Sequence, residues 1–435
     1  MIKKHLFLLG IFALTYFNSF GQSVTNSPYT RFGIGDIDRN GFNNSRAMGG
    51  ITTGLRKKNQ INYLNPAAIS AQDTMSFIFD IGINSIFKNM ESNTNSTEFN
   101  DFSFDHLAFS FPIKRWWFTS VGVSPYSKIG YNIHQISDYE PVDTINKHYK
   151  YYGNGGIVQV YLSNSFKIYE NLSFGFNVNY LFGSKEQYNQ FYLDSKYSKT
   201  TIVEDKISFK KITYDLGIQY HNEFANKYFY VIGLAYSSNA NFNSTKNSNV
   251  LLTDNYNFYD VKVLDYLANP SSTVDTLKSS ITDNYKIEIP AKYSIGFTAG
   301  IKDKLVLGFD YSYQDWSDVN MTTDNSNLDI DQSFKFGLEY TPNKFSLKNY
   351  YKKINYRAGL YLNESYIKID NEQIRNYGIT FGLGFPISNQ RTSLNFSCTF
   401  GKRGTTNNSL IEENYTAIGV NLTLYDFWFI KRKFD

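Results

Sequence analysis

The sequence predicts an all-β protein, a transmembrane antiparallel β-barrel of about 14 strands with an N-terminal lumenal plug. Three observations support this prediction. Bulky and small side chains alternate every two residues, long and short connections alternate along the chain, and aromatic residues are abundant. Segments of about ten residues, apolar on one face and polar on the other, are typical of barrels that span an outer membrane.

The alternation is clearest over residues 292–313. Before a polar turn at 302–304, every second residue from Tyr293 to Ile301 is apolar or aromatic, and Ser, Gly and Thr lie between them. The pattern resumes from Leu305 to Tyr313. Successive side chains of a strand point to opposite faces, so this stretch predicts a hairpin with one bulky face and one small face. A sandwich needs bulky residues on its inward face. We therefore expect the bulky face to contact lipid and the small face to line a wet lumen.

The connections between the predicted strands alternate in length. Strand-like segments cover roughly 75–87, 101–113, 116–126, 155–168, 171–184, 206–221, 227–239, 285–301, 304–315, 332–342, 352–363, 375–386, 391–402 and 414–427. The odd-numbered connections are expected to be long, as at 88–100, 127–154 and 364–374, and the even-numbered ones short. Outer-membrane barrels combine long extracellular loops with short periplasmic turns, and an even strand count places both termini in the periplasm.

Composition excludes several classes of protein. The chain has 435 residues, of which 18% are aromatic and 42% hydrophobic, with a mean hydropathy of −0.39. No mature stretch reaches the roughly 20 apolar residues of a spanning helix. The net charge is only +4 and Lys/Arg-rich blocks are absent, so we expect no nucleic-acid partner. A single cysteine, Cys398, excludes a disulfide within the chain.

The N-terminus predicts export. Lys3, Lys4 and His5 precede an apolar stretch at 6–17, and small residues at 19–21 match a cleavage site. We expect residues 1–21 to be a signal peptide cleaved after Gly21, with an uncleaved anchor as the alternative. The predicted organisation is then signal peptide 1–21, plug 22–73 and barrel 74–435, located in the cell outer membrane.

Short motifs along the mature chain indicate a family. They are Arg46-Ala47-Met48-Gly49-Gly50, Asn65-Pro66-Ala67-Ala68, the run Ile289 to Phe297, Asp310-Tyr311-Ser312-Tyr313 with Trp316, Tyr356-Arg357-Ala358-Gly359, and the run Tyr377 to Pro386. In this order the chain resembles the FadL/TodX type of outer-membrane transport protein. The resemblance implies a barrel whose N-terminal segment forms a hatch in the lumen. It also implies passive uptake of small hydrophobic molecules such as fatty acids or aromatic hydrocarbons, which leave sideways beside a kinked strand.

Six residues of the predicted plug are candidates for this hatch. Asn65 and Pro66 match the hatch motif, although Asn-Pro is also an ordinary turn. Arg31 and Arg46 are expected to pair with lumenal carboxylates such as Asp310, either as a latch or as a structural salt bridge. Phe32 and Met48, with Ile34 and Ile51, line either a small hydrophobic pocket or the plug's own packing core.

Pro125 is the candidate for a lateral opening. It cannot donate a ladder hydrogen bond, so it marks either a kink in the wall or the end of the third strand.

The sequence leaves one alternative function open. A barrel of this kind also serves as a non-transporting subunit or shuttle of an outer-membrane secretion or assembly complex, because a fold does not decide a function. Nothing in the sequence brings a nucleophile, base and orienter together, so we expect no enzyme, no metal and no cofactor. The expected partners are membrane lipid or lipopolysaccharide, a hydrophobic ligand and other outer-membrane proteins.

Overall fold

The computed structural model describes residues 25–38, 40–138, 145–195, 198–253, 274–319, 327–387 and 392–427. The predicted signal peptide and its cleavage site lie outside these residues. No helix of the described chain is long and apolar enough to cross a membrane. The elements are η1 (Pro28–Arg31), β1 (Asp36–Ile37), α2 (Asn43–Arg46), η2 (Pro66–Ala71), β2 (Ser76–Glu91), β3 (Ser96–Lys114), β4 (Trp117–Asp138), β5 (Asn146–Lys167), β6 (Leu172–Leu193), β7 (Thr200–Phe224), β8 (Tyr228–Ser237), β9 (Ala240–Thr253), β10 (Val274–Ile289), β11 (Lys292–Ile301), β12 (Leu305–Asp315), β13 (Asn327–Leu328), β14 (Ile330–Tyr340), η3 (Tyr350–Lys353), β15 (Asn355–Ile369), β16 (Glu372–Pro386), β17 (Ser393–Arg403), η4 (Asn407–Ser409) and β18 (Glu412–Phe427).

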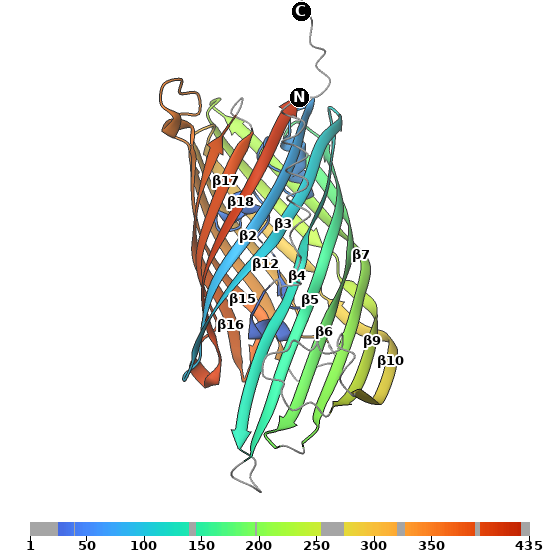
Figure 1. Ribbon diagram of the computed structural model, residues 1–435. Helices are drawn as coiled ribbons and strands as arrows, with labels where there is room; N and C mark the ends of the chain where they lie inside the picture. Colours follow the sequence, from blue (N-terminus) through green and yellow to red (C-terminus); the bar gives the residue numbers. More distant parts are fainter. Residues whose placement is uncertain are drawn as a thin grey trace, which may run out of the picture.

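The strands form one closed antiparallel barrel (Figure 1). The sheet has 18 strands, but β1 belongs to the segment before the barrel, and β8 with β9, β10 with β11 and β13 with β14 each form one wall strand. The wall therefore has fourteen strands, and β18 pairs with β2 along its whole length to close it. The predicted fold class is confirmed.

The predicted hairpin is β11–β12. Its register pairs Tyr293 with Tyr313 and Ile301 with Leu305. On its bulky face Phe297 is 48% exposed, whereas Thr298 on the small face is 1% exposed. The bulky side chains therefore point outward, and the small ones point into the barrel.

The strand ends differ from those predicted. The loops expected at 88–100 and 364–374 are tight turns at 92–95 and 370–371, and β4 runs on to Asp138 through a predicted loop. These extensions are rich in Asn, Ser and Lys. Such residues form strands here because ladder hydrogen bonds satisfy the backbone whatever the side chain. The predicted end of the third strand at Pro125 is therefore wrong.

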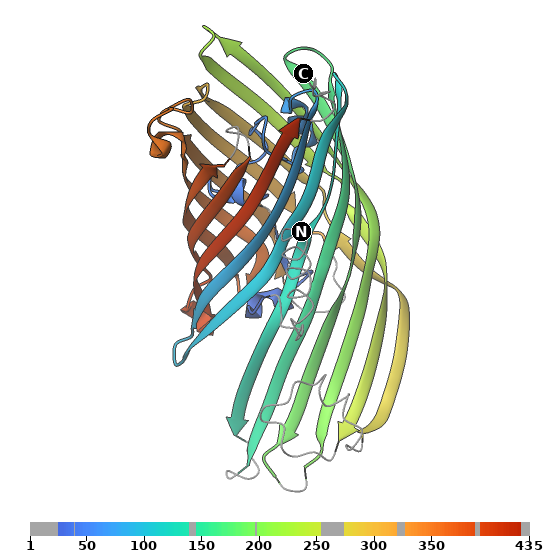
Figure 2. The same cartoon turned by 45° about the horizontal axis from the view of Figure 1, so that its top comes forward.

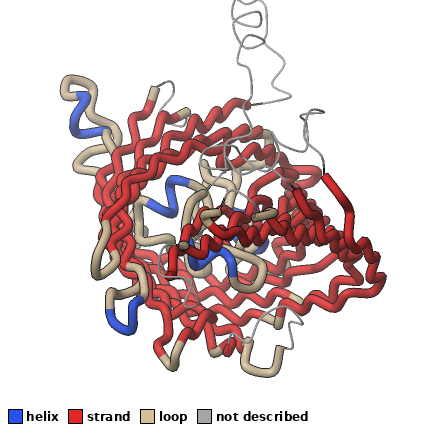
Figure 3. The backbone as a smooth tube through the Cα atoms, turned by 60° about the horizontal axis from the view of Figure 1, so that its bottom comes forward, coloured by secondary structure: helices blue, strands red, loops and turns tan. Residues whose placement is uncertain are grey.

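Residues 25–38 and 40–73, which we call the lumenal segment, lie inside the barrel (Figure 3). Most of them are buried against inward-facing wall residues. The small inner face makes this approach possible. A Cβ on Gly233 would lie 1.9 Å from the carbonyl oxygen of Thr53, and a Cβ on Gly359 would lie 2.1 Å from the amide nitrogen of Gly49. Side chains larger than glycine would collide with the segment at both positions.

The wall splits between β3 and β4, and we call this split the fork. β4 pairs with β5 at every position from Trp117 to Asp138 except one bulged residue, but with β3 only as far as the pair Leu107–Val123. Beyond that pair the two strands diverge toward the end with the long connections (Figure 2). The lumenal segment covers the open edge of β4, where β1 pairs with Ser127 and Lys128.

Candidate functional site

The candidate site comprises the lumenal segment, the wall residues that hold it, and the fork. Asp310 of β12 holds the middle of the segment. Its carboxylate accepts hydrogen bonds from the backbone amides of Thr52 (2.5 Å), Thr53 (2.6 Å) and Gly54 (3.2 Å). Asp310 therefore contacts the segment, as expected, but it binds amides and not Arg31 or Arg46. A carboxylate that accepts several backbone amides makes strong, charge-assisted contacts.

Arg46 fastens the segment beside the fork. Its guanidinium pairs with Asp38 of the same segment and, at 2.5 Å, with Asp105 of β3. Burial alone would lower the pKa of Arg46, but the carboxylates of Asp105 and Asp38 outweigh it and raise this pKa above its ordinary value. Arg46 does meet a lumenal carboxylate, on a different strand from the one expected.

The network continues through His106, which the sequence did not single out as a site residue. Its Nδ1 lies 2.6 Å from Asp105 and its Nε2 lies 2.8 Å from Asp80. Both ring nitrogens face carboxylate oxygens, an arrangement that a doubly protonated ring satisfies. Phe42 of the segment stacks on the imidazole, with ring centroids 3.6 Å apart. Ion pairs and stacking thus join the segment to β2 and β3 where the fork begins.

Arg31 and Phe32 lie toward the long-connection end. The Arg31 guanidinium lies 4.7 Å from the ring centroid of Tyr151, and Lys185 donates a 2.7 Å hydrogen bond to the Arg31 carbonyl. Phe32 packs against an apolar cluster of lumenal side chains that includes Ile34. Met48 instead packs with Ile51 and Leu55. The four apolar residues therefore do not line one pocket.

Asn65 and Pro66 form a buried turn. Asn65 accepts a hydrogen bond from the amide of Ala67 and donates one of 2.7 Å to the carbonyl of Thr53. Pro66 begins η2, and both residues are buried. The Asn-Pro pair thus starts a helical turn and also ties two parts of the segment together.

Arg56 is a buried cation that sequence reasoning missed. It donates hydrogen bonds to the carbonyl of Ala67, to Ser70 and to Gln219, all of them neutral acceptors. Burial lowers the pKa of Arg56 to about 10. No pattern in the sequence distinguishes Arg56 from the adjacent Lys57, which pairs with Glu339 at 2.5 Å.

Pro125 lies at the fork, two residues beyond Val123, the last β4 residue that pairs with β3. The ladder with β5 is interrupted between Pro125 and Ser127, which leaves Tyr126 as a bulge. Across the split, the Lys128 ammonium donates a 3.0 Å hydrogen bond to the Ser103 hydroxyl. The amide of Asn26 donates a 3.1 Å hydrogen bond to Asp101. Side chains and the segment therefore bridge the fork where strand pairing does not.

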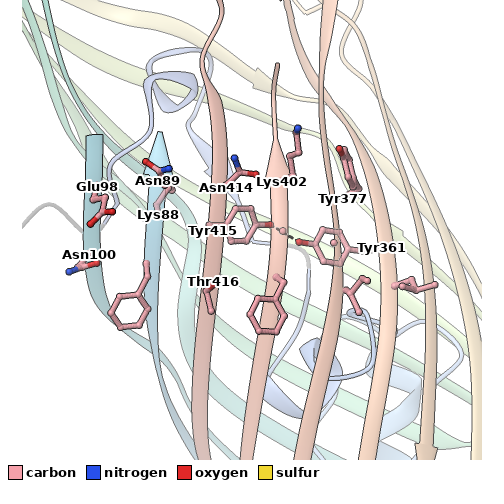
Figure 4. Close-up of a pocket in the computed structure, with 16 residues that line it drawn as sticks. Lys88, Asn89, Glu98, Asn100, Tyr361, Tyr377, Lys402, Asn414, Tyr415 and Thr416 are labelled. Atoms are coloured by element: carbon pink, nitrogen blue, oxygen red, sulfur yellow. Dashed lines mark hydrogen bonds between the residues drawn. The ribbon is translucent and has the colours of Figure 1, made fainter. Parts of the chain in front are cut away.

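Two hollows adjoin the site. One, of about 230 Å³, lies in the lumen and is lined by charged residues that include Asp36, Asp38, Arg46, Lys88, Lys128, Arg403 and Glu413. The other, of about 950 Å³, is more open and includes outward-facing residues such as Phe87, Leu360, Ile379 and Phe400 (Figure 4). Behind it the hydroxyls of Tyr361 and Tyr415 meet at 2.6 Å. Within the described residues, no three potential metal ligands converge.

The apolar cluster occupies the lumen toward the long connections. Its buried members come from the segment and from many wall strands, and include Tyr29, Ile34, Ile157, Leu181, Phe209, Phe242, Ile287, Trp316 and Tyr366. The charged hollow adjoins this cluster, because Ile37 and Tyr366 belong to both.

Comparison with known proteins assigns the family. A family model described as BamG matches residues 1–435. The chain belongs to the BamG family. A search of curated proteins finds no match.

Solved structures match the BamG-family barrel in fold. The toluene transporter TbuX of Ralstonia pickettii is 15% identical with a TM-score of 0.59, covering 89% of this chain and 98% of its own. The CymD monoaromatic hydrocarbon channel is 14% identical with a TM-score of 0.56, covering 90% and 98%. A Pseudomonas aeruginosa FadL homologue is 12% identical with a TM-score of 0.53, covering 87% and 95%. At these identities the likeness shows the fold alone, and for the fold the resemblance to FadL/TodX barrels is confirmed. The chain is a transmembrane β-barrel.

Proposed function

We propose that this barrel passes small hydrophobic molecules across the outer membrane and releases them sideways through the fork. The observation that carries the proposal is the end of β3–β4 pairing at Leu107 and Val123, although both strands continue beyond this pair. Outward-facing Phe102 and Phe104 border the fork on β3, so its outer side lies at the depth of apolar lipid chains. Solved barrels of the same fold are described as a toluene transporter and a hydrocarbon channel, which supports this substrate class.

In this mechanism the molecule enters from the long-connection end. The apolar cluster around Ile34 and Phe32 is the first lumenal surface it meets. The lumenal segment acts as the plug and hatch, with Arg31, Phe32, Arg46, Met48, Asn65 and Pro66 as its working residues. The charged hollow reaches the fork, because Arg46 and Lys128 line it. We expect the solute to pass beside it while these cations keep their partners Asp105 and Ser103, because leaving a charge without water or partner is costly.

Two wall residues have particular roles in this proposal. Asp310 is the latch that keeps the segment seated, through its three amide contacts. Pro125 preserves the opening, because a proline offers no amide hydrogen for renewed pairing along β4. The gradient of the solute drives passage.

A second candidate is a non-transporting subunit or shuttle of an outer-membrane secretion or assembly complex. The observation in its favour is the firm seating of the segment. Buried contacts hold the segment on β3, β12 and β14, through Arg46, the amides of 52–54 and Lys57 respectively. A segment that never moves would seal the lumen, and the barrel would then act through its surface.

Native purification from the outer membrane in mild detergent separates the two candidates. Mass spectrometry of everything retained would find fatty acid or aromatic hydrocarbon on a solitary barrel if the transport proposal is right. A stoichiometric set of partner proteins without a small molecule would contradict it and favour the second candidate.

A further inference from the structure

The longest connection at the short-turn end of the barrel has an unusual surface. Residues 341–354, which we call the basic loop, join β14 to β15 and contain η3. The loop carries Lys344, Lys348, Lys352 and Lys353 and no acidic residue. Other turns at this end, such as 302–304, consist of only a few residues and cannot form a comparable surface.

The basic loop also exposes four large apolar or aromatic side chains. Leu347 is 94% exposed and Phe345 is 64% exposed, and Tyr350 and Tyr351 are each more than half exposed. Single exposed apolar residues are common on protein surfaces, but four in one short loop mark a contact site.

The loop is ordered by its own hydrogen bonds. The amide of Asn343 donates to the carbonyl of Lys352 at 2.8 Å, and the amide of Lys352 donates to the carbonyl of Asn349 at 3.2 Å. The side chain of Asn343 accepts from the amide of Phe345 at 3.1 Å. The exposed apolar groups are therefore held in place before any partner arrives, which lowers the entropic cost of binding.

The position of the loop identifies what it faces. Tyr340 and Tyr356 are register partners on the outward face at the base of the loop, and outward tyrosines mark the membrane–water interface. The Tyr356 hydroxyl donates to the carbonyl of Tyr351 at 3.0 Å, and the Tyr350 hydroxyl donates to the carbonyl of Pro386 at 2.9 Å. These bonds draw the loop over the outer rim, and it projects away from the barrel axis (Figures 1 and 3).

We propose that the basic loop is a lipid-binding site that inserts Leu347 and Phe345 into the adjoining membrane leaflet and binds anionic phospholipid headgroups through Lys348, Lys352 and Lys353. A basic surface with exposed apolar groups binds at the boundary between headgroups and acyl chains, and anionic lipid strengthens its binding. Lys344 is not assigned to this role because it pairs with Asp303 at 2.8 Å. The site is independent of passage through the lumen.

The test places an environment-sensitive fluorophore on the loop of the full-length barrel. Leu347→Cys is labelled in a Cys398→Ser background and reconstituted into vesicles of phosphatidylcholine, with or without phosphatidylglycerol, that contain a lipid-borne quencher. Glu170→Cys, on the exposed turn between β5 and β6, is the matched control. We expect strong quenching at position 347 and weak quenching at position 170, with phosphatidylglycerol increasing the difference.

The lysines are tested by the variant Lys348→Gln/Lys352→Gln/Lys353→Gln. It is expected to lose its preference for phosphatidylglycerol by at least about tenfold, because each lysine near an anionic surface contributes about 1 kcal/mol. Equal quenching at positions 347 and 170 would overturn the proposal. A response that is the same with and without phosphatidylglycerol, or unchanged in the triple variant, would also overturn it.

A photoreactive residue at position 347 in living cells gives an independent readout. Adducts with phospholipid are expected. Adducts with another protein, or with a second copy of this chain, would contradict a lipid-facing loop.

Discussion

β4 has two neighbouring strands in the wall, β3 and β5, and it pairs with them over very different lengths. It has 21 register pairs with β5 but only 7 with β3. On the β3 side, the lumenal segment takes over part of the missing strand, because β1 pairs with β4 and the Ser27 amide donates to the Gly130 carbonyl at 2.7 Å. The open edge of β3 gains side-chain contacts but no such strand. A strand of a membrane barrel can therefore leave its neighbour where the chain inside the barrel satisfies the edge that is exposed.

We expect the largest difference between proline substitutions at the fork and proline substitutions in the closed wall, measured as folding of the barrel. Phe396 and Ser397 of β17 pair with strands on both sides, so Phe396→Pro and Ser397→Pro each remove a ladder bond in lipid surroundings. An unsatisfied group there costs several kcal/mol, and neither variant should fold. Phe102 and Ser103 of β3 pair on one side only, and adjacent amides of a strand point to opposite sides. One of Phe102→Pro and Ser103→Pro should therefore still fold.

Heat-modifiable electrophoretic mobility of the four proline variants in the outer membrane checks this prediction. Failure of both β3 variants would mean that the edge of β3 is paired in the membrane.

The next largest effect is expected for Arg46, whose ion pair with Asp105 holds the lumenal segment beside the fork. Arg46→Met removes the guanidinium that pairs with Asp38 and Asp105, and breaking a buried ion pair costs about 3–5 kcal/mol. We expect the segment to detach from β3 and become sensitive to protease while the barrel persists. Adding Asp105→Asn should restore part of the resistance. An Arg46→Met protein that resists protease as well as the wild type would contradict the proposed role of Arg46 in holding the segment.

A somewhat smaller effect is expected for Asp310, which holds the lumenal segment on β12 in the closed wall. Asp310→Ala leaves the amides of residues 52–54 without their acceptor, at a cost of about 3 kcal/mol. Thermal unfolding and limited proteolysis should both show a looser segment. Asp310→Asn, which keeps one acceptor oxygen, is the control and should lie between the alanine variant and the wild type. Equal behaviour of all three proteins would exclude a latch at this position.

The smallest effect tests the space that glycine leaves for the segment. Gly359→Ala places a methyl group against Gly49, and overpacking of this kind costs about 1–3 kcal/mol. Ala358→Val, at the adjacent outward-facing position, is the matched control and should leave proteolysis of the segment unchanged. The prediction fails if both variants behave alike.

Much of the wall could be predicted from the sequence, because alternation over 292–313 determines both the strand period and the lipid-facing side. The strand ends could not, since Asn- and Ser-rich extensions such as 127–138 lack the apolar face on which the prediction depended. Trp316 shows the same limit. Its position at the end of a predicted strand does not reveal that it is fully buried and stacks on Tyr366, with centroids 4.3 Å apart.

For the candidate site, the sequence indicated Asp310 as a residue that holds the segment, but not the backbone amides that it binds. Asp310 is conspicuous as a carboxylate on a face of Gly, Ser and Thr, whereas backbone amides carry no sequence signal that would identify them as its ligands. The fork itself has no local signature. Residues 96–100 and 127–138 were predicted as parts of loops, and the separation of β3 from β4 depends on which strands meet in three dimensions. Pro125 was the one local indication, and it lies at the fork.

The most direct test of lateral passage closes the fork reversibly and measures uptake. In a Cys398→Ser background, Ser103→Cys and Lys128→Cys, whose native side chains are hydrogen-bonded across the split, are joined by a short reducible cross-linker. Ser85→Cys with Ile418→Cys, register partners within the closed wall, forms the control. If solutes leave through the fork, proteoliposome uptake of toluene is lost on cross-linking at 103 and 128 and returns on reduction, while the control pair has no effect. Uptake that continues unchanged with the fork closed would contradict lateral passage through this wall.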